Sequence, residues 1–432
     1  MLKMIRFLPL LVLLAIAPSA VYAQVASPTI NVLHIKGTIN PILVDYIERG
    51  IEQAEEESAA ALIIQMDTPG GLDTIMRDII QLIDRAQVPI VVYVPSGARA
   101  ASAGFFITIA ADVAAMAPDT AIGAATPVSI GTEGEAQISE EMQAKVINDA
   151  IAYAKAIANT NGRNIEWAEK AVREGASVPA YEALELNVID IIATDMNALI
   201  SQLDGWQVTE PDGSIFTLNT QGATAKDIEM TTIEGFLFAI SDPNIAYILL
   251  SLAILGITVE IFNPGLIFPG IVGAIAGLLA FFSLGMLPVN YAGILLMILA
   301  FALFVAEAFT ATFGLLTAGG IASLVIGSLI LFKGGPLFKV NPALIATVAI
   351  FFTALLAFVV NRVIAAHRRQ ATTGREELPG ETTLVKTALA PEGTVFHEGE
   401  IWTAVLDKGR AEPGEEVLIT KVEGLKLYVT KK

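Results

Sequence analysis

The sequence predicts a multidomain protein in which an α/β domain, an α-helical transmembrane bundle and a C-terminal all-β barrel follow one another. Strand-like and helix-like segments alternate in the first half, long apolar segments fill the region 241–366, and short strands separated by turns follow residue 380. A hydrophobic content of 54% and a mean hydropathy of +0.63 favour membrane segments over a purely soluble protein.

The alternation in the first half is typical of parallel strands joined by crossover helices. The strand-like and helix-like segments are Ile30–Ile35, Pro41–Glu57, Ala61–Met66, Leu72–Ala86 and Ile90–Val94. From Leu203 to Asp242 the sequence becomes polar and rich in turn residues. We interpret this stretch as a subdomain edge and linker.

The first 23 residues predict an export signal. Lys3 and Arg6 precede the apolar run Phe7–Ala17, and small residues lead to Ala23. We expect cleavage near Ala23, and we expect the α/β domain at 24–240 to be translocated whether or not the signal is removed. An uncleaved anchor is the alternative, although the apolar run is short for a membrane span.

Apolar segments, each close to the roughly 20 residues that cross a bilayer, predict about five transmembrane helices in 241–366. They are Ile245–Phe262, Leu266–Leu287, Tyr291–Phe309, Gly314–Phe332 and Ala343–Ile364. Arginines that follow the last segment place the C-terminal end in the cytoplasm by the positive-inside rule. Five spans then place the α/β domain outside the cell membrane. Lys333 and Lys339 would also lie outside, and a re-entrant segment within 245–290 is the competing topology.

Two acidic residues, Glu260 and Glu307, lie within these predicted spans. Charges inside a bilayer are costly, so a charged residue there is expected to be paired with another polar group and to serve a function. Both residues are close to segment ends, and placement at the membrane interface is the simpler interpretation. We assign them to no site.

After a linker at 367–380, residues 381–432 predict a small barrel of the OB type. Turns such as Pro413-Gly414 and Glu423-Gly424 separate its short strands. The strands are Thr382–Val385, Gly393–Val395, Ile401–Val405, Val417–Val422 and Leu425–Val429. The segment has no obvious stacking aromatics or basic groove, which favours binding of a protein over single-stranded nucleic acid.

Charge and composition exclude several classes of function. The net charge of -18 argues against nucleic acid as a partner. The absence of cysteine excludes disulfides, thiolate metal sites and a cysteine nucleophile. We expect no metal and no organic cofactor.

Small residues surround Ser102 in the stretch Gly97–Gly104, directly after the strand-like run Ile90–Val94. Another strand-like run ends in Asp67-Thr68-Pro69-Gly70-Gly71. Small residues let the backbone turn tightly around an exposed hydroxyl, and paired glycines can direct N–H groups at a developing oxyanion. The pattern predicts an acyl-transfer enzyme with Ser102 as the nucleophile. Ser96 is a rival that ranks lower.

The base for this serine is either a histidine or a lysine. His34 lies on a strand-like run that we expect in the core, and it is the weaker candidate. Among the lysines, Lys145 falls at the edge of the apolar face of a helix at about Ser139–Ala158, whereas Lys155 points away from that face. We expect Lys145 to be partly buried, because desolvation disfavours the charged amine and makes it a usable base. A lysine lying along apolar surface is the alternative. The lysines considered are Lys36, Lys145, Lys155, Lys170 and Lys226.

The predicted oxyanion hole uses backbone donors. The N–H of Ala103 directly follows the nucleophile and would lie at a helix start, where N–H groups are free. Either Gly70 or Gly71 would supply the second donor, and the sequence does not choose between them. An ordinary strand-to-helix turn is the alternative interpretation of these glycines.

Motifs along nearly the whole chain resemble those of the long form of the NfeD family, membrane-bound serine proteases related to the ClpP and signal-peptide-peptidase fold. Asn187 is a departure, because such domains often carry glycine there. The matching motifs are Asp67–Gly71, Ala100–Gly104, Met116–Pro118, Ile122–Ala124, Trp167–Val172 and Ala183–Asp190, with Pro391–Gly393 and Gly399–Trp402 in the tail.

The resemblance implies an α/β ClpP/crotonase-like protease domain with a Ser/Lys dyad, which transfers to Ser102 and Lys145. It also implies a dimer or higher homo-oligomer, ATP-independent cleavage of hydrophobic peptide segments, and stomatin-like membrane proteins as partners. A crotonase-type acyl-CoA enzyme shares the fold and is one alternative. A non-catalytic membrane scaffold that organises stomatin-like proteins is the other.

Overall fold

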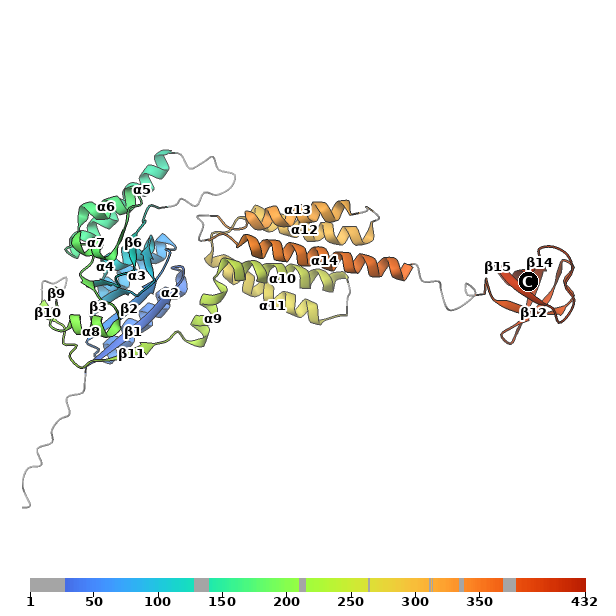
Figure 1. The fold of residues 1–432 in the computed structure, drawn as a ribbon, viewed down its shortest axis with the longest axis horizontal. Helices are drawn as coiled ribbons and strands as arrows, with labels where there is room; N and C mark the ends of the chain where they lie inside the picture. The colour runs from blue at the N-terminus through green and yellow to red at the C-terminus, as the bar shows by residue number, and fades with distance from the viewer. Residues whose placement is uncertain are drawn as a thin grey trace, which may run out of the picture. The chain divides into compact units, whose positions relative to one another are not determined.

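The computed structural model describes residues 28–127, 140–209, 215–262, 265–310, 312, 314–333, 338–367 and 378–432 (Figure 1). The expected export signal at 1–23 and most of the expected linker at 367–380 lie outside these residues. The chain divides into two compact units. One unit comprises Met1–Glu307 with Thr312–Thr347, and the other comprises Ala308–Ala311 with Val348–Lys432.

The first half of the chain forms a six-stranded parallel sheet in the order β11-β1-β2-β3-β5-β8. Side chains on both faces of its central strands are buried, as in β3, where all five residues are buried. The prediction of a parallel α/β domain is confirmed. The strands are β1 (Thr29–Lys36), β2 (Ala61–Asp67), β3 (Ile90–Val94), β5 (Val113–Met116), β8 (Ile191–Ile192) and β11 (Thr224–Ile228).

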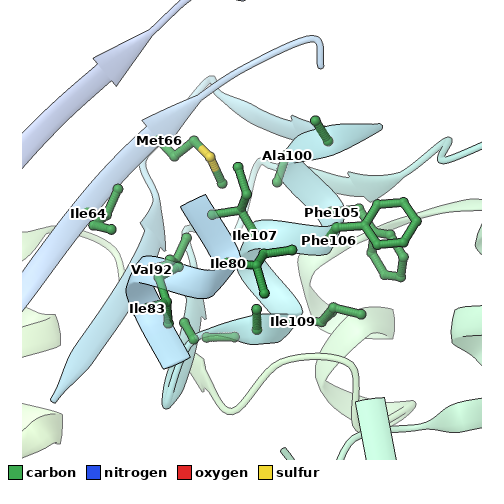
Figure 2. Packing of buried hydrophobic residues seen from close by; sticks show 14 of the residues in the cluster. Ile64, Met66, Ile80, Ile83, Val92, Ala100, Phe105, Phe106, Ile107 and Ile109 are labelled. Carbon is green, nitrogen blue, oxygen red and sulfur yellow. The ribbon is translucent and has the colours of Figure 1, made fainter. Parts of the chain in front are cut away.

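Helices α2 (Pro41–Glu56), α3 (Asp73–Arg85) and α4 (Ala103–Ala110) share one hydrophobic core with one face of the sheet. Figure 2 shows Ile80 of α3 and Ile107 of α4 meeting in this core. The other face packs against α8 (Met196–Leu203). The two layers hold the strands rigidly, and the loops at their ends are positioned by that scaffold.

A second, three-stranded sheet contains residues of the predicted motifs. Its order is β4-β6-β7, and β4 contains Ala100 and Ala101 of the serine motif. The elements around it are β4 (Arg99–Ala101), β6 (Ala121–Gly123), α5 (Glu140–Thr160), α6 (Ile165–Arg173), β7 (Ser177–Pro179) and α7 (Ala180–Glu185).

The polar stretch from Leu203 to Asp242 is more than the expected edge and linker. After the hairpin of β9 (Gln207–Thr209) and β10 (Ile215–Thr217), strand β11 joins the main sheet beside β1, and helix α9 (Thr232–Ile240) follows. The sequence looked like a linker because β11 is an edge strand, in which only Ile228 is buried. Tyr46 fixes it by donating its hydroxyl hydrogen to the carbonyl oxygen of Ile228 at 2.6 Å.

Apolar helices follow, named α10 (Pro243–Phe262), α11 (Phe268–Met286), α12 (Tyr291–Phe309), α13 (Leu315–Leu329) and α14 (Pro342–His367). Within the described residues, α10 and α11 are long and apolar enough to cross a membrane, and the other apolar stretches are shorter. Gly256 of α10 and Gly273 of α11 allow close packing, because a Cβ on either glycine would lie less than 3 Å from the other helix's backbone. Glu307 accepts hydrogen bonds from the N–H groups of Gly314 and Thr317, so it caps the following helix.

The C-terminal residues form a closed five-stranded barrel in the order β12-β13-β14-β16-β15. Its core includes Val395, Ala404 and Leu427, which are fully buried. All five strand predictions are confirmed. The strands are β12 (Thr382–Thr387), β13 (Glu392–His397), β14 (Glu400–Leu406), β15 (Glu416–Glu423) and β16 (Lys426–Lys431).

Candidate active site

Ser102 lies at the junction of β4 and α4 in a conformation that L-residues rarely adopt. Its φ is 54° and its ψ is -116°, which costs about 1–3 kcal/mol. The Ser102 N–H donates to the carbonyl oxygen of Gly123 at 2.9 Å, and the Ser102 carbonyl accepts from the N–H of Phe105 at 3.0 Å. All eight residues of α4 are buried, so the helix cannot shift to relieve this strain. Such strained turns between a strand and a helix present a nucleophile in known hydrolases.

The structure brings the two predicted motifs together. A Cβ added to Gly70 would lie 2.6 Å from Ser102 Cβ and 3.1 Å from Ser102 Oγ. Backbone hydrogen bonds hold the two loops in this arrangement. The N–H of Thr68 donates to Arg99 O at 2.9 Å, and the N–H of Ala101 donates to Thr68 O at 3.1 Å. The glycine turn therefore lies directly against the serine.

Hydrogen bonding distinguishes the two glycines. The N–H of Gly70 donates to Thr68 Oγ1 at 3.0 Å, whereas among the described residues the N–H of Gly71 has no partner. Ala103 is the first residue of α4, and its N–H has no intrahelical acceptor. A Cβ on Gly71 would lie 2.2 Å from Ile39 O, so only glycine fits there. Of the predicted donors, Gly71 and Ala103 are therefore the two whose N–H groups have no hydrogen-bond partner among the described residues.

Lys145 is not partly buried as the helical pattern predicted. Its side chain is exposed on the first half of α5, and the neighbouring Met142 and Val146 are 51% and 39% exposed. No hydrogen bond joins Lys145 to Ser102 in the structure. The prediction failed because apolar spacing shows which face a helix could bury, but not whether another element covers it. The second half of α5 does pack, through Ala150, Ile151 and Ala154.

The rival residues have other partners. Ser96 Oγ donates to Asp119 Oδ2 at 2.9 Å in an exposed turn. His34 Nε2 lies 2.9 Å from Asp227 Oδ1 of β11, and its side chain is 41% exposed although the strand itself is in the core. Neither contact involves the glycine turn.

Two of the other lysines form ion pairs on the surface. Lys155 Nζ lies 2.9 Å from Glu169, and Lys226 Nζ lies 2.6 Å from Glu57. Lys226 and Gln53 donate to the Glu57 carboxylate and lower its pKa to about 2. Lys155 thus pairs with α6 and makes no contact with the glycine turn.

Two further glycines support the site, and their roles were not predicted from the sequence. A Cβ on Gly104 would lie 2.4 Å from Thr68 Cγ2, and one on Gly123 would lie 2.2 Å from Ala176 O. Gly104 lets α4 approach the glycine turn, and Gly123 accepts the hydrogen bond of the Ser102 N–H. Both lie within motifs that the sequence displays, but only the fold shows what they contact.

The fold and site define a class of protein: an α/β domain with a strained serine against a two-glycine turn, followed by apolar membrane helices and a small barrel. In the described residues, no group of three or more histidines or carboxylates could hold a metal ion. Three family models match in the same order. They are the NfeD1b N-terminal domain at 29–227, the NfeD integral membrane domain at 244–362, and the NfeD-like C-terminal, partner-binding domain at 375–431.

The chain belongs to the NfeD family, and it is a membrane protein. It is 38% identical over 416 residues to the membrane-bound protease PH1510 of Pyrococcus horikoshii, with 94% of each chain covered. It is 28% identical over 435 residues to the membrane protein NfeD1b of Bacillus subtilis, again with 94% of each covered. The family prediction is confirmed.

Solved structures are similar to the α/β domain. One is the 1510-N membrane-bound stomatin-specific protease, as a lysine-to-alanine mutant in complex with a substrate peptide. It is 35% identical and covers 50% of this chain and 98% of its own, with a TM-score of 0.46. A serine-to-alanine mutant of the same protease is also 35% identical and covers 48% and 100%, with a TM-score of 0.44.

Proposed function

We propose that this protein is a membrane-anchored, ATP-independent serine endopeptidase with a ClpP-like protease domain and a Ser102/Lys145 dyad. The contact between strained Ser102 and the Gly70-Gly71 turn carries the proposal, because it places a half-buried serine hydroxyl beside a turn in which the N–H of Gly71 has no partner among the described residues. The relative that is 38% identical is a membrane-bound protease, which supports the same reaction class.

In the proposed mechanism, neutral Lys145 removes the proton from Ser102 Oγ while that oxygen attacks the carbonyl carbon of the scissile peptide bond. The negative charge on the carbonyl oxygen is stabilised by the N–H groups of Gly71 and Ala103. The Lys145 ammonium then donates its proton to the leaving amine as the C–N bond breaks. A water molecule, deprotonated by Lys145, hydrolyses the acyl-enzyme and restores both groups.

Because Lys145 is exposed, we propose that the dyad forms only when the first half of α5 is covered. Met142 and Val146 expose apolar surface on the helix face at whose edge Lys145 lies. A second copy of the chain or a bound apolar substrate would cover this face and exclude water from the amine. Desolvation would then favour neutral Lys145. We therefore propose a homo-oligomer, dimeric or higher, as the active form.

The proposed substrates are hydrophobic segments of membrane-associated proteins, with stomatin-like proteins as partners. A related protease is described as stomatin-specific, and the matched C-terminal family model is described as partner-binding. The barrel has an exposed apolar row that could bind such a partner. Leu384 pairs with Phe396, which pairs with Ile401 across three adjacent strands, and these side chains are 47%, 43% and 56% exposed.

We propose the following organisation for the chain. A signal peptide at 1–23 precedes a protease domain at 24–240 outside the cell membrane, and a transmembrane bundle of about five helices occupies 241–366. A linker at 367–380 leads to a cytoplasmic OB-fold domain at 381–432. The described apolar helices support the membrane region of this arrangement, and the closed barrel supports a separate C-terminal domain.

The test uses the full-length protein in lipid nanodiscs with a panel of apolar peptides. We expect Ser102→Ala and Lys145→Met to abolish cleavage. Ser96→Ala and Lys155→Met are the matched controls and should retain it, because both lie in separate contacts. The rate of the active forms should rise with pH, since a larger fraction of the amine is then neutral.

The alternatives predict different results. A crotonase-type acyl-CoA enzyme needs no serine hydroxyl, so unchanged turnover of an acyl-CoA by Ser102→Ala would favour that class. A scaffold needs the barrel but not the serine, and the exposed row Leu384, Phe396 and Ile401 favours a binding role. If Ser102→Ala restores the phenotype of a deletion strain, the protease activity is not the protein's essential role.

A further inference from the structure

Helix α9 has two opposite faces with different surroundings. On one side, Glu234 and Phe238 are largely covered by the α/β domain. On the other side, Ile233 is 71% exposed, Phe236 is 49% exposed, and Ala239 is also exposed. At about 100° per residue these three side chains share one side of the helix. The outward face of α9 is therefore apolar.

The inward face is fixed by strong contacts. Arg49 of α2 binds Glu234 with two hydrogen bonds, Nε to Oε1 at 3.0 Å and Nη2 to Oε2 at 2.7 Å. Thr231 and Glu234 form a capping box at the start of the helix. The Phe238 ring packs on Gly37, where an added Cβ would lie 3.2 Å from Phe238 Cζ. The exposed face is thus held in place and is not a fraying end.

The C-terminal end of α9 meets the membrane helices. Ser283 of α11 donates its hydroxyl hydrogen to the carbonyl oxygen of Ile240, and α10 begins only three residues later at Pro243. Helices of the length of α10 and α11 span about 30 Å, which is the thickness of the hydrocarbon core. In the proposed transmembrane arrangement, the start of α10 and the end of α11 at Met286 mark one boundary of the bilayer. All of these residues belong to one compact unit.

We propose that α9 lies in the headgroup region of the bilayer, with Ile233 and Phe236 inserted among the acyl chains. Continuity with α10 and α11 places the exposed apolar face at membrane depth. The helix has no lysine or arginine, and its one carboxylate is paired with Arg49. The bound surface is therefore zwitterionic lipid held by apolar contact, not by charge.

The proposed insertion fixes the distance between the serine site and the bilayer. Ile39 accepts the N–H of Leu72 at 3.1 Å and donates to Gly70 O at 2.9 Å, so it holds the glycine turn. Ile39 and Leu72 also line a small void together with Pro243 and Met286 at the ends of the membrane helices. A substrate bond that reaches Ser102 would thus lie close to the membrane surface. This last consequence rests on the proposed protease activity, whereas the insertion of α9 rests only on α10 and α11 crossing the membrane.

The chain has no cysteine, which allows single nitroxide labels. Ile233→Cys and Phe236→Cys would each be labelled in the full-length protein in phosphatidylcholine nanodiscs, with Ser201→Cys on the exposed side of α8 as the control. We expect labels at 233 and 236 to be more accessible to oxygen than to a water-soluble nickel chelate, and the label at 201 to show the reverse. Greater access to the chelate at both α9 positions would overturn the proposal. Protection from both reagents would also overturn it and would indicate a second copy of the chain on this face.

A second measurement uses activity. The double variant Ile233→Ser/Phe236→Ser should cleave a membrane-anchored substrate severalfold more slowly than the wild type and cleave the same sequence as a soluble peptide at the wild-type rate. Equal loss on both substrates would contradict an anchoring role. If neither substrate is cleaved even by the wild type, the proposed protease function fails, and the label accessibilities still decide where α9 lies.

Discussion

Replacing Gly70 by alanine tests the geometry of the serine site. The new Cβ would lie 2.6 Å from Ser102 Cβ, closer than real Cβ contacts, and Gly70 has a φ of 119°. Backbone strain of about 1–3 kcal/mol and overpacking of a similar size predict a loss of about 2–6 kcal/mol in the free energy of unfolding. Displacement of Ser102 should also lower turnover, since misplacement by about 1 Å costs on the order of 100-fold.

Gly97→Ala is the matched control. Gly97 has a φ of 76° but no atom within 4 Å of its added Cβ, so the substitution introduces backbone strain without a clash. It should destabilise the protein by about 1–2 kcal/mol and leave peptide cleavage intact. Denaturant unfolding gives the free energies, and kcat and KM for an apolar peptide give the activity. If the two variants behave alike in both assays, the close contact between Gly70 and Ser102 is refuted.

Three further predictions concern two ion pairs of the α/β domain and the exposed apolar row of the barrel. Arg49→Met should lower the free energy of unfolding by about 1–3 kcal/mol, because it leaves the largely covered Glu234 carboxylate without its charged donor. Lys226→Met should lower it much less, because the Lys226–Glu57 pair is exposed. Denaturant unfolding of both variants measures the difference. The pKa of Glu57 is lowered to about 2 in the folded state, so its ion pair with Lys226 stabilises the protein above the ordinary carboxyl pKa of roughly 4.3 and loses this effect as the pH falls toward 2. Unfolding curves measured over a pH series should show that acid lowers the free energy of unfolding less in Lys226→Met than in the wild type. Phe396→Ser should weaken partner binding to the full-length protein without unfolding the barrel, and unchanged capture of a stomatin-like protein would exclude the apolar row as its binding surface.

The sequence was most informative where a local residue pattern matches the burial seen in the structure. Ile90–Val94 is a continuous apolar run and forms a strand buried on both faces. Ser102 among small residues predicted a tight turn, and the structure shows a positive φ at that residue. The two motifs could be paired in advance because both follow neighbouring parallel strands, β2 and β3, whose ends meet at one edge of the sheet.

Long-range contacts could not be predicted in the same way. Strand β11 appeared as a linker because edge strands carry polar residues, and nothing local shows that Thr224–Ile228 pairs with Thr29–Leu33. Lys145 was placed correctly on α5, but its exposure depends on whether another element covers that face. The difference between Gly70 and Gly71 is also invisible in the sequence, because it comes from the hydrogen bond of the Gly70 N–H to Thr68 Oγ1, which depends on a side-chain rotamer.

Covalent labelling of the nucleophile tests the proposed chemistry most directly. The full-length protein in nanodiscs would be treated with a fluorophosphonate, which reacts with activated serine hydroxyls, and digested for mass spectrometry. We predict phosphonylation of Ser102 in the wild type and in Ser96→Ala, and strongly reduced labelling of Ser102 in Lys145→Met. Labelling of another serine, or cleavage of apolar peptides that persists in Ser102→Ala, would contradict the assignment of Ser102 as the nucleophile.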